Sequence, residues 1–345
     1  MDLLTLISRG VVPIIDFKSM KGDVKPFMAK YGGHINSIGI VVKDETGRGY
    51  FDNSAAPPAS PDHAKFLRSS AELFQSLEIK VYAIVDAFLD SRAIREPRRR
   101  SIDRFGKQSE RFSCPSNVSN QNDLAKLVEE LASTKLVDNI VVTDSGFVRR
   151  DYCFCDSCQK EFAQRNKLPL PVTSNSLASK QGMYDDWIKW RSEVVTRVLD
   201  QASKRVAEVS SKTQREIAFY GAVDVDERTG YFDGATRDFG QKAEDIMKSS
   251  NLAVRIQPWT PIIPSNDTPE YSRTINALKT VSNLLSDNNR KGLILVWNIE
   301  TEEDLATTKD MEKALSASGV LSFLGYPQSI GPQRDAHLGL DLEAK

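Results

Sequence analysis

Short apolar runs alternate with longer segments of helical periodicity along most of the chain. Eight runs are rich in aliphatic and aromatic residues, as strands buried on both faces of a parallel sheet are; they cover 11–16, 35–42, 80–86, 139–144, 216–224, 252–258, 292–298 and 319–325. Between most of them, apolar residues recur every three or four positions. This spacing predicts helices over 64–77, 123–133, 185–209, 239–247, 271–285 and 301–315.

Strict alternation of strands and helices predicts an α/β fold with a parallel sheet. Eight such units are the number that closes the sheet, so we expect a single (β/α)8 TIM barrel over 1–330 and a polar C-terminal tail over 331–345. The alternative is an open doubly wound sheet. Neither GxGxxG nor GxxxxGK[ST] follows a predicted strand, which excludes the usual nucleotide-binding form of that alternative.

Three predicted connections from strand to helix are long and polar. They follow the second, third and fourth strands and cover 43–61, 88–123 and 145–182. Barrel enzymes build their sites from such connections, at the carboxyl ends of the strands. We therefore expect extended loops after these strands and a functional site among them.

Composition narrows the candidate functions. The 345 residues include 46 Lys and Arg against 47 Asp and Glu, so a net charge of −1 provides no attraction to nucleic acid. The apolar runs are too short to cross a bilayer, and the N-terminal residues do not have the pattern of a signal peptide. We expect a cytoplasmic protein that binds no membrane. Its three scattered histidines do not suit a histidine-based metallohydrolase, so carboxylates are the candidate catalytic groups.

The four cysteines have the spacing of a metal site. Cys153, Cys155 and Cys158 lie within six residues, and Cys114 lies on the preceding long loop. Four thiolates at about 2.3 Å would complete a tetrahedral, structural Zn²⁺ site with no open position. A disulfide fits a cytosolic chain less well, and four unrelated buried thiols are the other alternative. Zinc bound here would join the loops that follow the third and fourth strands.

The cysteines lie within two segments, 111–117 (RFSCPSN) and 152–162 (YCFCDSCQKEF), and a third segment, 187–191 (WIKWR), follows them. Together they resemble the zinc-bearing region of family 42 β-galactosidases, in which a Cys-Pro-Asn segment and a CxCxxC run bind one structural zinc. The resemblance implies a glycoside-hydrolase-like barrel with a carbohydrate substrate. Relatives of this kind often assemble, so a homo-oligomer is a candidate state.

The resemblance also implies positions for two catalytic carboxylates. The family places its acid/base Glu at the end of the fourth strand, nine residues before the first Cys of the run, where this chain has Asp144. The family's Asn-Glu pair therefore reads Thr143-Asp144, a departure that shortens the acid by one methylene. The family's nucleophile, a Glu near the end of the seventh strand, corresponds to Glu300.

Glycoside hydrolysis needs two carboxyl groups that flank one bond, and two assignments are open. In the first, Asp144 is the acid/base and Glu300 the nucleophile, which the cysteine register favours. In the second, Asp144 is the nucleophile, as in α-amylase-like barrels, and Asp224 or Asp226 is the acid. The alternative function is a catalytically inactive barrel that binds a carbohydrate or a protein partner.

Other residues near the predicted strand ends are candidates for substrate binding. Aromatic rings pack on the C–H faces of sugars, which suggests Trp259, Trp297 and Tyr326. Asp86 ends the third strand. Arg149 and the neighbouring Arg150 could bind an anionic sugar or keep carboxylates ionised. Trp187 and Trp190, by contrast, are expected to pack in the core because of their helical spacing.

Overall fold

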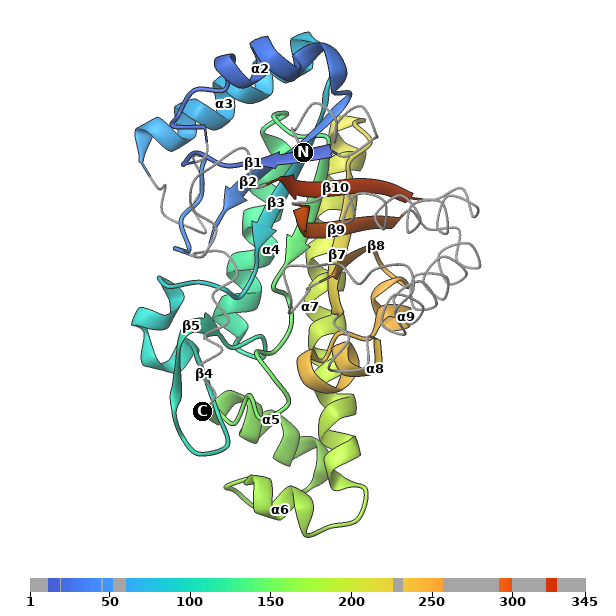
Figure 1. Cartoon of the computed structure of the whole chain (residues 1–345). Coiled ribbons are helices and arrows are strands. Elements are labelled where there is room, and N and C mark those ends of the chain that lie inside the picture. The colour runs from blue at the N-terminus through green and yellow to red at the C-terminus, as the bar shows by residue number, and fades with distance from the viewer. Residues whose placement is uncertain are drawn as a thin grey trace.

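The computed structural model describes residues 12–18, 20–44, 46–51, 60–225, 232–256, 292–299 and 321–327. Its sheet is parallel and curled, and its strands pair in an order that closes on itself, because β1 pairs with β10 (Figure 1). The strands of this sheet are β1 (Val12–Ile15), β2 (Ser37–Lys43), β3 (Lys80–Asp86), β6 (Asn139–Thr143), β7 (Ala218–Val225), β8 (Asn251–Ile256), β9 (Gly292–Ile299) and β10 (Leu321–Pro327).

All eight predicted strands are confirmed, and their ends differ from the prediction by at most two residues. Side chains of the described strands alternate between two apolar clusters. Ile14, Ile84 and Val141 face the interior of the curled sheet, whereas Ile40 and Val142 pack toward the helices. Burial on both faces explains why these strands read as continuous apolar runs rather than as alternating ones.

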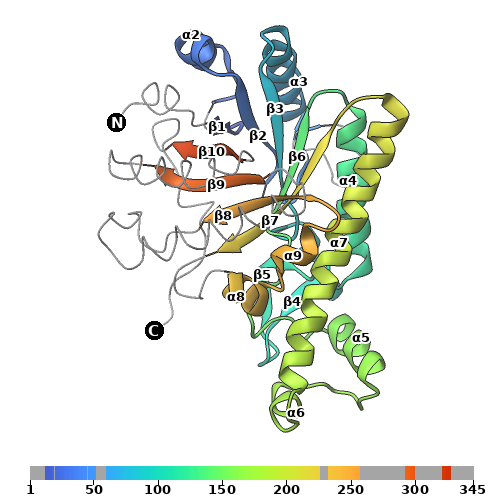
Figure 2. The ribbon, with the colours of Figure 1, turned by 90° about the vertical axis from the view of Figure 1, so that its right-hand side faces the viewer.

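Helices α3 (Pro61–Ser76), α4 (Val118–Ser133) and α7 (Met183–Thr213) confirm three of the predicted helices. Helix α4 begins earlier than its apolar pattern does, because the Asn117 side chain accepts hydrogen bonds from the backbone N–H groups of Ser119 and Asn120. Helices α4 and α7 lie side by side along one flank of the sheet (Figure 2). The helices expected over 271–285 and 301–315 lie outside the described residues, so the complete (β/α)8 barrel stays a prediction.

The helix predicted over 239–247 is only partly correct. Short helix α8 (Phe232–Gly234) continues into a π-helical turn, η4 (Ala235–Phe239), and α9 (Ala243–Ile246) follows after a break. Gly240 forms the break with a φ of +71°, and a Cβ there would lie 3.1 Å from the Arg191 backbone. Apolar periodicity does not reveal this close approach, which only a glycine tolerates without strain.

Long loops after the third and fourth strands are confirmed, and both contain additional structure. The loop after β3 forms a hairpin from β4 (Arg100–Ile102) and β5 (Gln108–Ser113), and the loop after β6 contains α5 (Asp156–Asn166) and α6 (Ser174–Ala178). These elements lie beyond the carboxyl ends of β3 and β6 (Figure 1). The remaining elements are α2 (Lys25–Tyr31) and the 3-10 turns η1 (Gly32–His34), η2 (Ala93–Arg95) and η3 (Pro97–Arg99).

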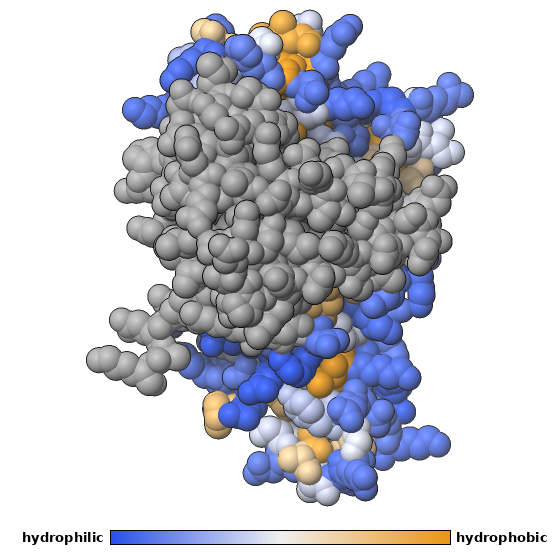
Figure 3. All heavy atoms as spheres, turned by 45° about the vertical axis from the view of Figure 1, so that its right-hand side comes forward, coloured by the Kyte–Doolittle hydropathy of each residue, from blue (hydrophilic) through white to orange (hydrophobic). Residues whose placement is uncertain are grey.

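On the face drawn in Figure 3, hydrophilic residues cover most of the described surface, and hydrophobic areas are small. Large apolar side chains that are exposed, such as Leu77, Phe105 and Leu170, come from separate elements. Isolated surface hydrophobic residues are ordinary in folded proteins. Within the described part of the chain, no helix has the length and apolar character needed to span a bilayer.

Candidate functional site

Three acidic side chains from neighbouring strands lie at one end of the sheet. Asp86 is the last residue of β3, Asp144 directly follows β6, and Asp224 is the penultimate residue of β7. These strands are adjacent and parallel, so their carboxyl ends meet at the same mouth. Asp144 has a φ of +48°, a backbone conformation that Asp tolerates better than most residues.

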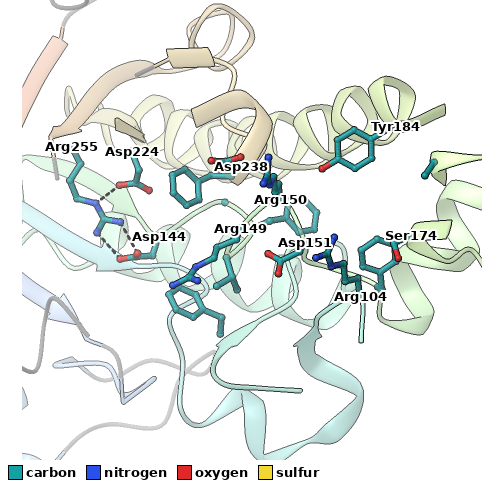
Figure 4. A pocket seen from close by; sticks show the side chains of 17 residues that line it. Arg104, Asp144, Arg149, Arg150, Asp151, Ser174, Tyr184, Asp224, Asp238 and Arg255 are labelled. Atoms are coloured by element: carbon teal, nitrogen blue, oxygen red, sulfur yellow. Dashed lines mark hydrogen bonds and ion pairs between the residues drawn. The ribbon is translucent and has the colours of Figure 1, made fainter. Parts of the chain in front are cut away.

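Arg255 on β8 joins two of these acids (Figure 4). Its terminal nitrogens donate to the two carboxylate oxygens of Asp144 at 2.7 and 2.8 Å, and its Nε donates to Asp224. The side chains of all three residues are about one-tenth exposed or less. This bidentate, charge-assisted contact stabilises the ionised form of a carboxylate. Arg255 was not among the predicted site residues, although a charged residue within the apolar run of β8 was a visible signal.

Both carboxylate oxygens of Asp224 accept hydrogen bonds. Besides the contact with Arg255, its Oδ2 accepts a hydrogen bond from Gln241 Nε2 at 3.0 Å, and its backbone N–H donates to Gln241 Oε1 at 2.7 Å. Burial raises the pKa of Asp224, and the charge of Arg255 opposes this effect. Gln241 follows the break at Gly240, so its position could not be read from helical periodicity.

Asp86 has a different environment from the other two acids. The Thr143 hydroxyl donates to Asp86 Oδ1 at 2.7 Å. Burial, together with the nearby negative charge of Asp144, raises the pKa of Asp86 to about 7. A carboxyl group with this pKa can either donate or accept a proton near neutral pH.

Two further acids extend the arrangement to the first strands. Asp16 directly follows β1, Asp44 directly follows β2, and both are buried. The Tyr50 hydroxyl donates to Asp44 Oδ2 at 2.9 Å, and the Lys43 ammonium lies 3.3 Å from Asp90. Neither Asp16 nor Asp44 was among the predicted site residues, although Asp16 ends a predicted strand and Asp44 lies two residues after another.

A cavity of about 600 Å³ lies beside Asp144, a size common for small-molecule sites. Asp144, Asp224 and Arg255 line one end, and Tyr184 and Ser174 mark the opposite end (Figure 4). Its walls come from the loop after β6, the β4–β5 hairpin, the α6–α7 region and the π-helical turn. The cavity is therefore bounded by the extended loops that the sequence predicts.

A buried arginine on α7 holds two walls of this cavity together. The guanidinium of Arg191 donates to the backbone oxygens of Arg149, Arg237 and Asp238 at 2.6 to 2.9 Å. It also lies 4.7 Å from the centre of the Phe147 ring. Burial lowers the pKa of Arg191 to about 10, so the group remains charged at neutral pH.

The four cysteines form one buried cluster, with all sulfur atoms within 4.8 Å of one another. Cys114 Sγ lies 3.4 Å from both Cys155 Sγ and Cys158 Sγ. A tetrahedral ion with 2.3 Å bonds requires sulfurs about 3.8 Å apart, so the cluster fits the size of such a site. The thiols are free, which disagrees with the disulfide alternative. These cysteines could together bind a metal ion.

Some of the expected site residues cannot be compared with this geometry. Trp259, Asp226 and Glu300 lie outside the described residues. For Trp297 on β9 and Tyr326 on β10 the structure describes the backbone, where the two residues are partners in register. Arg149 lines the cavity. Trp187 and Trp190 are buried against Phe162, as predicted for core residues.

The fold is similar to that of solved glycoside hydrolases. The glycoside hydrolase domain of PgaB (BpsB) from Bordetella bronchiseptica matches with a TM-score of 0.65 and 13% identity, over 93% of this chain and 94% of that one. The catalytic domain of β-amylase from Paenibacillus polymyxa matches with a TM-score of 0.62 and 11% identity, over 95% and 96%. A cold-adapted β-galactosidase from Rahnella sp. R3 matches with a TM-score of 0.64 and 10% identity, over 92% of this chain and 50% of that one.

No protein-family model matches the sequence, and no curated protein does. At these identities the structural matches establish a glycoside-hydrolase-like fold and leave the residue roles to be argued from the site itself.

Proposed function

We propose that this protein is a glycoside hydrolase with a complete (β/α)8 barrel, and that it cleaves a glycosidic bond in the cavity beside Asp144. The observation that carries the proposal is the placement of Asp144 and Asp224 on one guanidinium at the edge of this cavity. Two carboxyl groups on one bond are the chemical requirement of this reaction. The glycoside-hydrolase-like fold supports the same reaction class and does not identify the sugar.

The contacts of Asp144 bear on its role. Arg255 donates to both of its oxygens, and a carboxylate stabilised in this way is suited to act as a nucleophile. Burial raises the pKa of Asp224, which is the direction required of a general acid. We therefore favour the second assignment, with Asp144 as nucleophile and Asp224 or Asp226 as acid. The first assignment, with Asp144 as acid/base and Glu300 as nucleophile, stays a prediction of the family register.

A screen of aryl glycosides tests the reaction. With wild-type protein active on one substrate, we expect Asp144→Asn to lower kcat/KM by at least about 10³-fold, because one of two catalytic carboxylates is lost. Asp200→Asn, at a partly exposed ion pair on α7, is the control and should retain activity. Unchanged hydrolysis by Asp144→Asn would contradict the proposal.

Trapping the intermediate separates the two assignments. A 2-fluoro derivative of the accepted sugar slows breakdown of the covalent intermediate, and peptide mapping then identifies the labelled residue. A label on Asp144 supports the assignment that we favour, and a label on Glu300 supports the family register. Sugar binding without any hydrolysis would support the inactive, carbohydrate-binding barrel, in which Arg255 would hold Asp144 in an unreactive ion pair.

For the cysteine cluster we propose zinc. Four thiolates are a ligand set that Zn²⁺ accepts, and using all four leaves no position for a substrate. The ion would connect Cys114, after the β4–β5 hairpin, to the three cysteines around the start of α5. Its role would be to hold two loops of the cavity in place, with no part in the chemical step.

A further inference from the structure

Three arginines line the cavity between its acidic end and its opposite end. Arg104 belongs to the turn of the β4–β5 hairpin, and Arg149 and Arg150 belong to the loop after β6. In Figure 4 they succeed one another from Arg149, nearest to Asp144, to Arg104, nearest to Ser174. All three are exposed. Within the part of the chain that the structure describes, none of their guanidinium groups has a hydrogen bond or an ion pair.

This lack of hydrogen bonds and ion pairs distinguishes them from other exposed arginines, although the Arg104 guanidinium lies 4.7 Å from the centre of the Phe105 ring. Arg165 and Arg197, on α5 and α7, are exposed and both form ion pairs with glutamates. In the cavity wall, Asp238 forms an ion pair with Arg237 at 3.2 Å. Asp144 and Asp224 both form ion pairs with Arg255. Among the described lining residues, Asp151 is then the acid left to balance three arginines. The middle and outer parts of the cavity are therefore positively charged.

The backbone that carries Arg149 is also held in place. Its carbonyl oxygen accepts a hydrogen bond from the buried Arg191 at 2.7 Å, which restricts the loop without engaging the Arg149 side chain. Aromatic residues Phe112, Phe154 and Tyr184 line the same cavity. Guanidinium groups bind oxyanions in a bidentate manner, and aromatic rings pack against sugar faces.

We propose that the cavity binds a glycan that carries an oxyanion group, a carboxylate or a sulfate, and that Arg149, Arg150 and Arg104 bind this group. The inference rests on the proposed function for the sugar, and it adds the charge class of the substrate. The anionic sugar lies beyond the one whose bond is next to Asp144. Binding through these arginines requires no hydrolysis, so it can be measured separately.

The test uses tetrasaccharides in matched pairs: oligogalacturonate with its methyl ester, and a sulfated galactan fragment with its desulfated form. Binding is measured by calorimetry at low salt, and product analysis of the same samples reports cleavage. We expect at least one charged member to bind at least 10-fold more tightly than its neutral partner, since hydrogen bonds between ionised groups are roughly twice as strong as neutral ones. The pair that responds identifies carboxylate or sulfate as the recognised group.

The double variant Arg149→Gln/Arg150→Gln should lose at least 10-fold in affinity for the charged member and none for the neutral one. Arg98→Gln, which removes an exposed arginine outside the cavity wall, should change neither. Equal binding of charged and neutral members, no binding of either pair, or an unaffected double variant would overturn the inference. Charge-selective binding without cleavage would support it while contradicting hydrolysis, and cleavage without charge selectivity would do the reverse.

Discussion

Asp86, Asp144 and Asp224 are all acids at strand ends, yet their partners give them different properties. Asp144 and Asp224 share the positive charge of Arg255, whereas Asp86 has a neutral hydroxyl as hydrogen-bond donor and feels the negative charge of Asp144. Burial near a like charge raises the pKa of a carboxyl group, and a paired cation lowers it. At neutral pH, Asp86 is therefore protonated in a larger fraction of molecules than an ordinary aspartate would be.

This difference predicts a pH dependence of stability. The pKa of Asp86 rises from 3.8 to about 7 on folding, so the folded state binds more protons between these values and the free energy of unfolding falls as pH rises through them. Asp86→Asn removes this titration. We expect the variant to gain up to about 4 kcal/mol over wild type between pH 4 and pH 8 in urea denaturation, because each pKa unit corresponds to about 1.4 kcal/mol. Asp200→Asn, treated in parallel, should show no such gain.

Among the elements, α7 connects the core to the cavity. Its buried face carries Trp187 and Trp190 into an aromatic cluster, and the adjacent Arg191 reaches the loops on the other side. A helix anchored by two tryptophans provides a rigid base for a side chain that must hold three backbone carbonyls. The hydrogen bonds of Arg191 thus couple the position of these loops to the packing of α7.

Replacing Arg191 by Met tests this connection. Three carbonyls would lose their donor, and a buried unsatisfied polar group costs about 1–3 kcal/mol, so we expect a loss of about 3 kcal/mol or more in the free energy of unfolding. Hydrogen exchange should become faster in 146–151 and 235–240. Arg197→Met, which removes an exposed ion pair on the same helix, should cost less than about 1 kcal/mol. Equal effects of the two substitutions would contradict the connecting role.

The cysteine cluster also lies between the two extended loops. Cys114 follows the β4–β5 hairpin, and the other three cysteines lie around the start of α5. We expect one zinc ion per wild-type chain by elemental analysis and less than half of that in Cys155→Ser, because a tetrahedral site loses one of four ligands. Hydrogen exchange should increase in 100–116 and 149–166 before the sheet unfolds. Ser157→Ala, within the same segment, should retain the metal. Wild-type protein without stoichiometric zinc would contradict the proposal.

At the scale of the whole molecule, the closing contact is the pairing of β1 with β10, where Val12 is the partner of Leu324. The first described strand thus pairs with the last described strand, although the two partner residues are 312 residues apart in the sequence. Loss of β10 would leave the edges of β1 and β9 unpaired, and unpaired edges promote aggregation.

Two truncations test this closure and the predicted domain boundary. A chain that ends at residue 330 should unfold within a few degrees of the full chain, because only the predicted polar tail is removed. A chain that ends at residue 320 should be insoluble or fail to show a cooperative thermal transition, since β10 is missing. Similar melting of the two truncated chains would contradict the closing role of β10.

Periodicity in the sequence was sufficient to locate the eight strands of the parallel sheet and the helices α3, α4 and α7, since burial of both sheet faces and of one helix face requires those patterns. The predicted strands also placed Asp144 and Asp224 at strand ends. The spacing of the cysteines showed three thiols within six residues. Periodicity failed at 239–247, where a tight contact with Arg191 outweighs helical preference. The β4–β5 hairpin was missed as well, since its strands are short and half-buried.

The identity of each partner was decided by the fold. Arg255 is 111 residues from Asp144 in sequence, and no local pattern relates the two. They meet because β6, β7 and β8 are consecutive in the closed sheet, so their carboxyl ends share one mouth. Tertiary structure likewise brings Arg191 to the loops whose backbone oxygens it contacts, and Cys114 to the other three cysteines. Local chemistry selects which groups a chain presents, whereas the charge and proton affinity of each depend on neighbours brought close by tertiary packing.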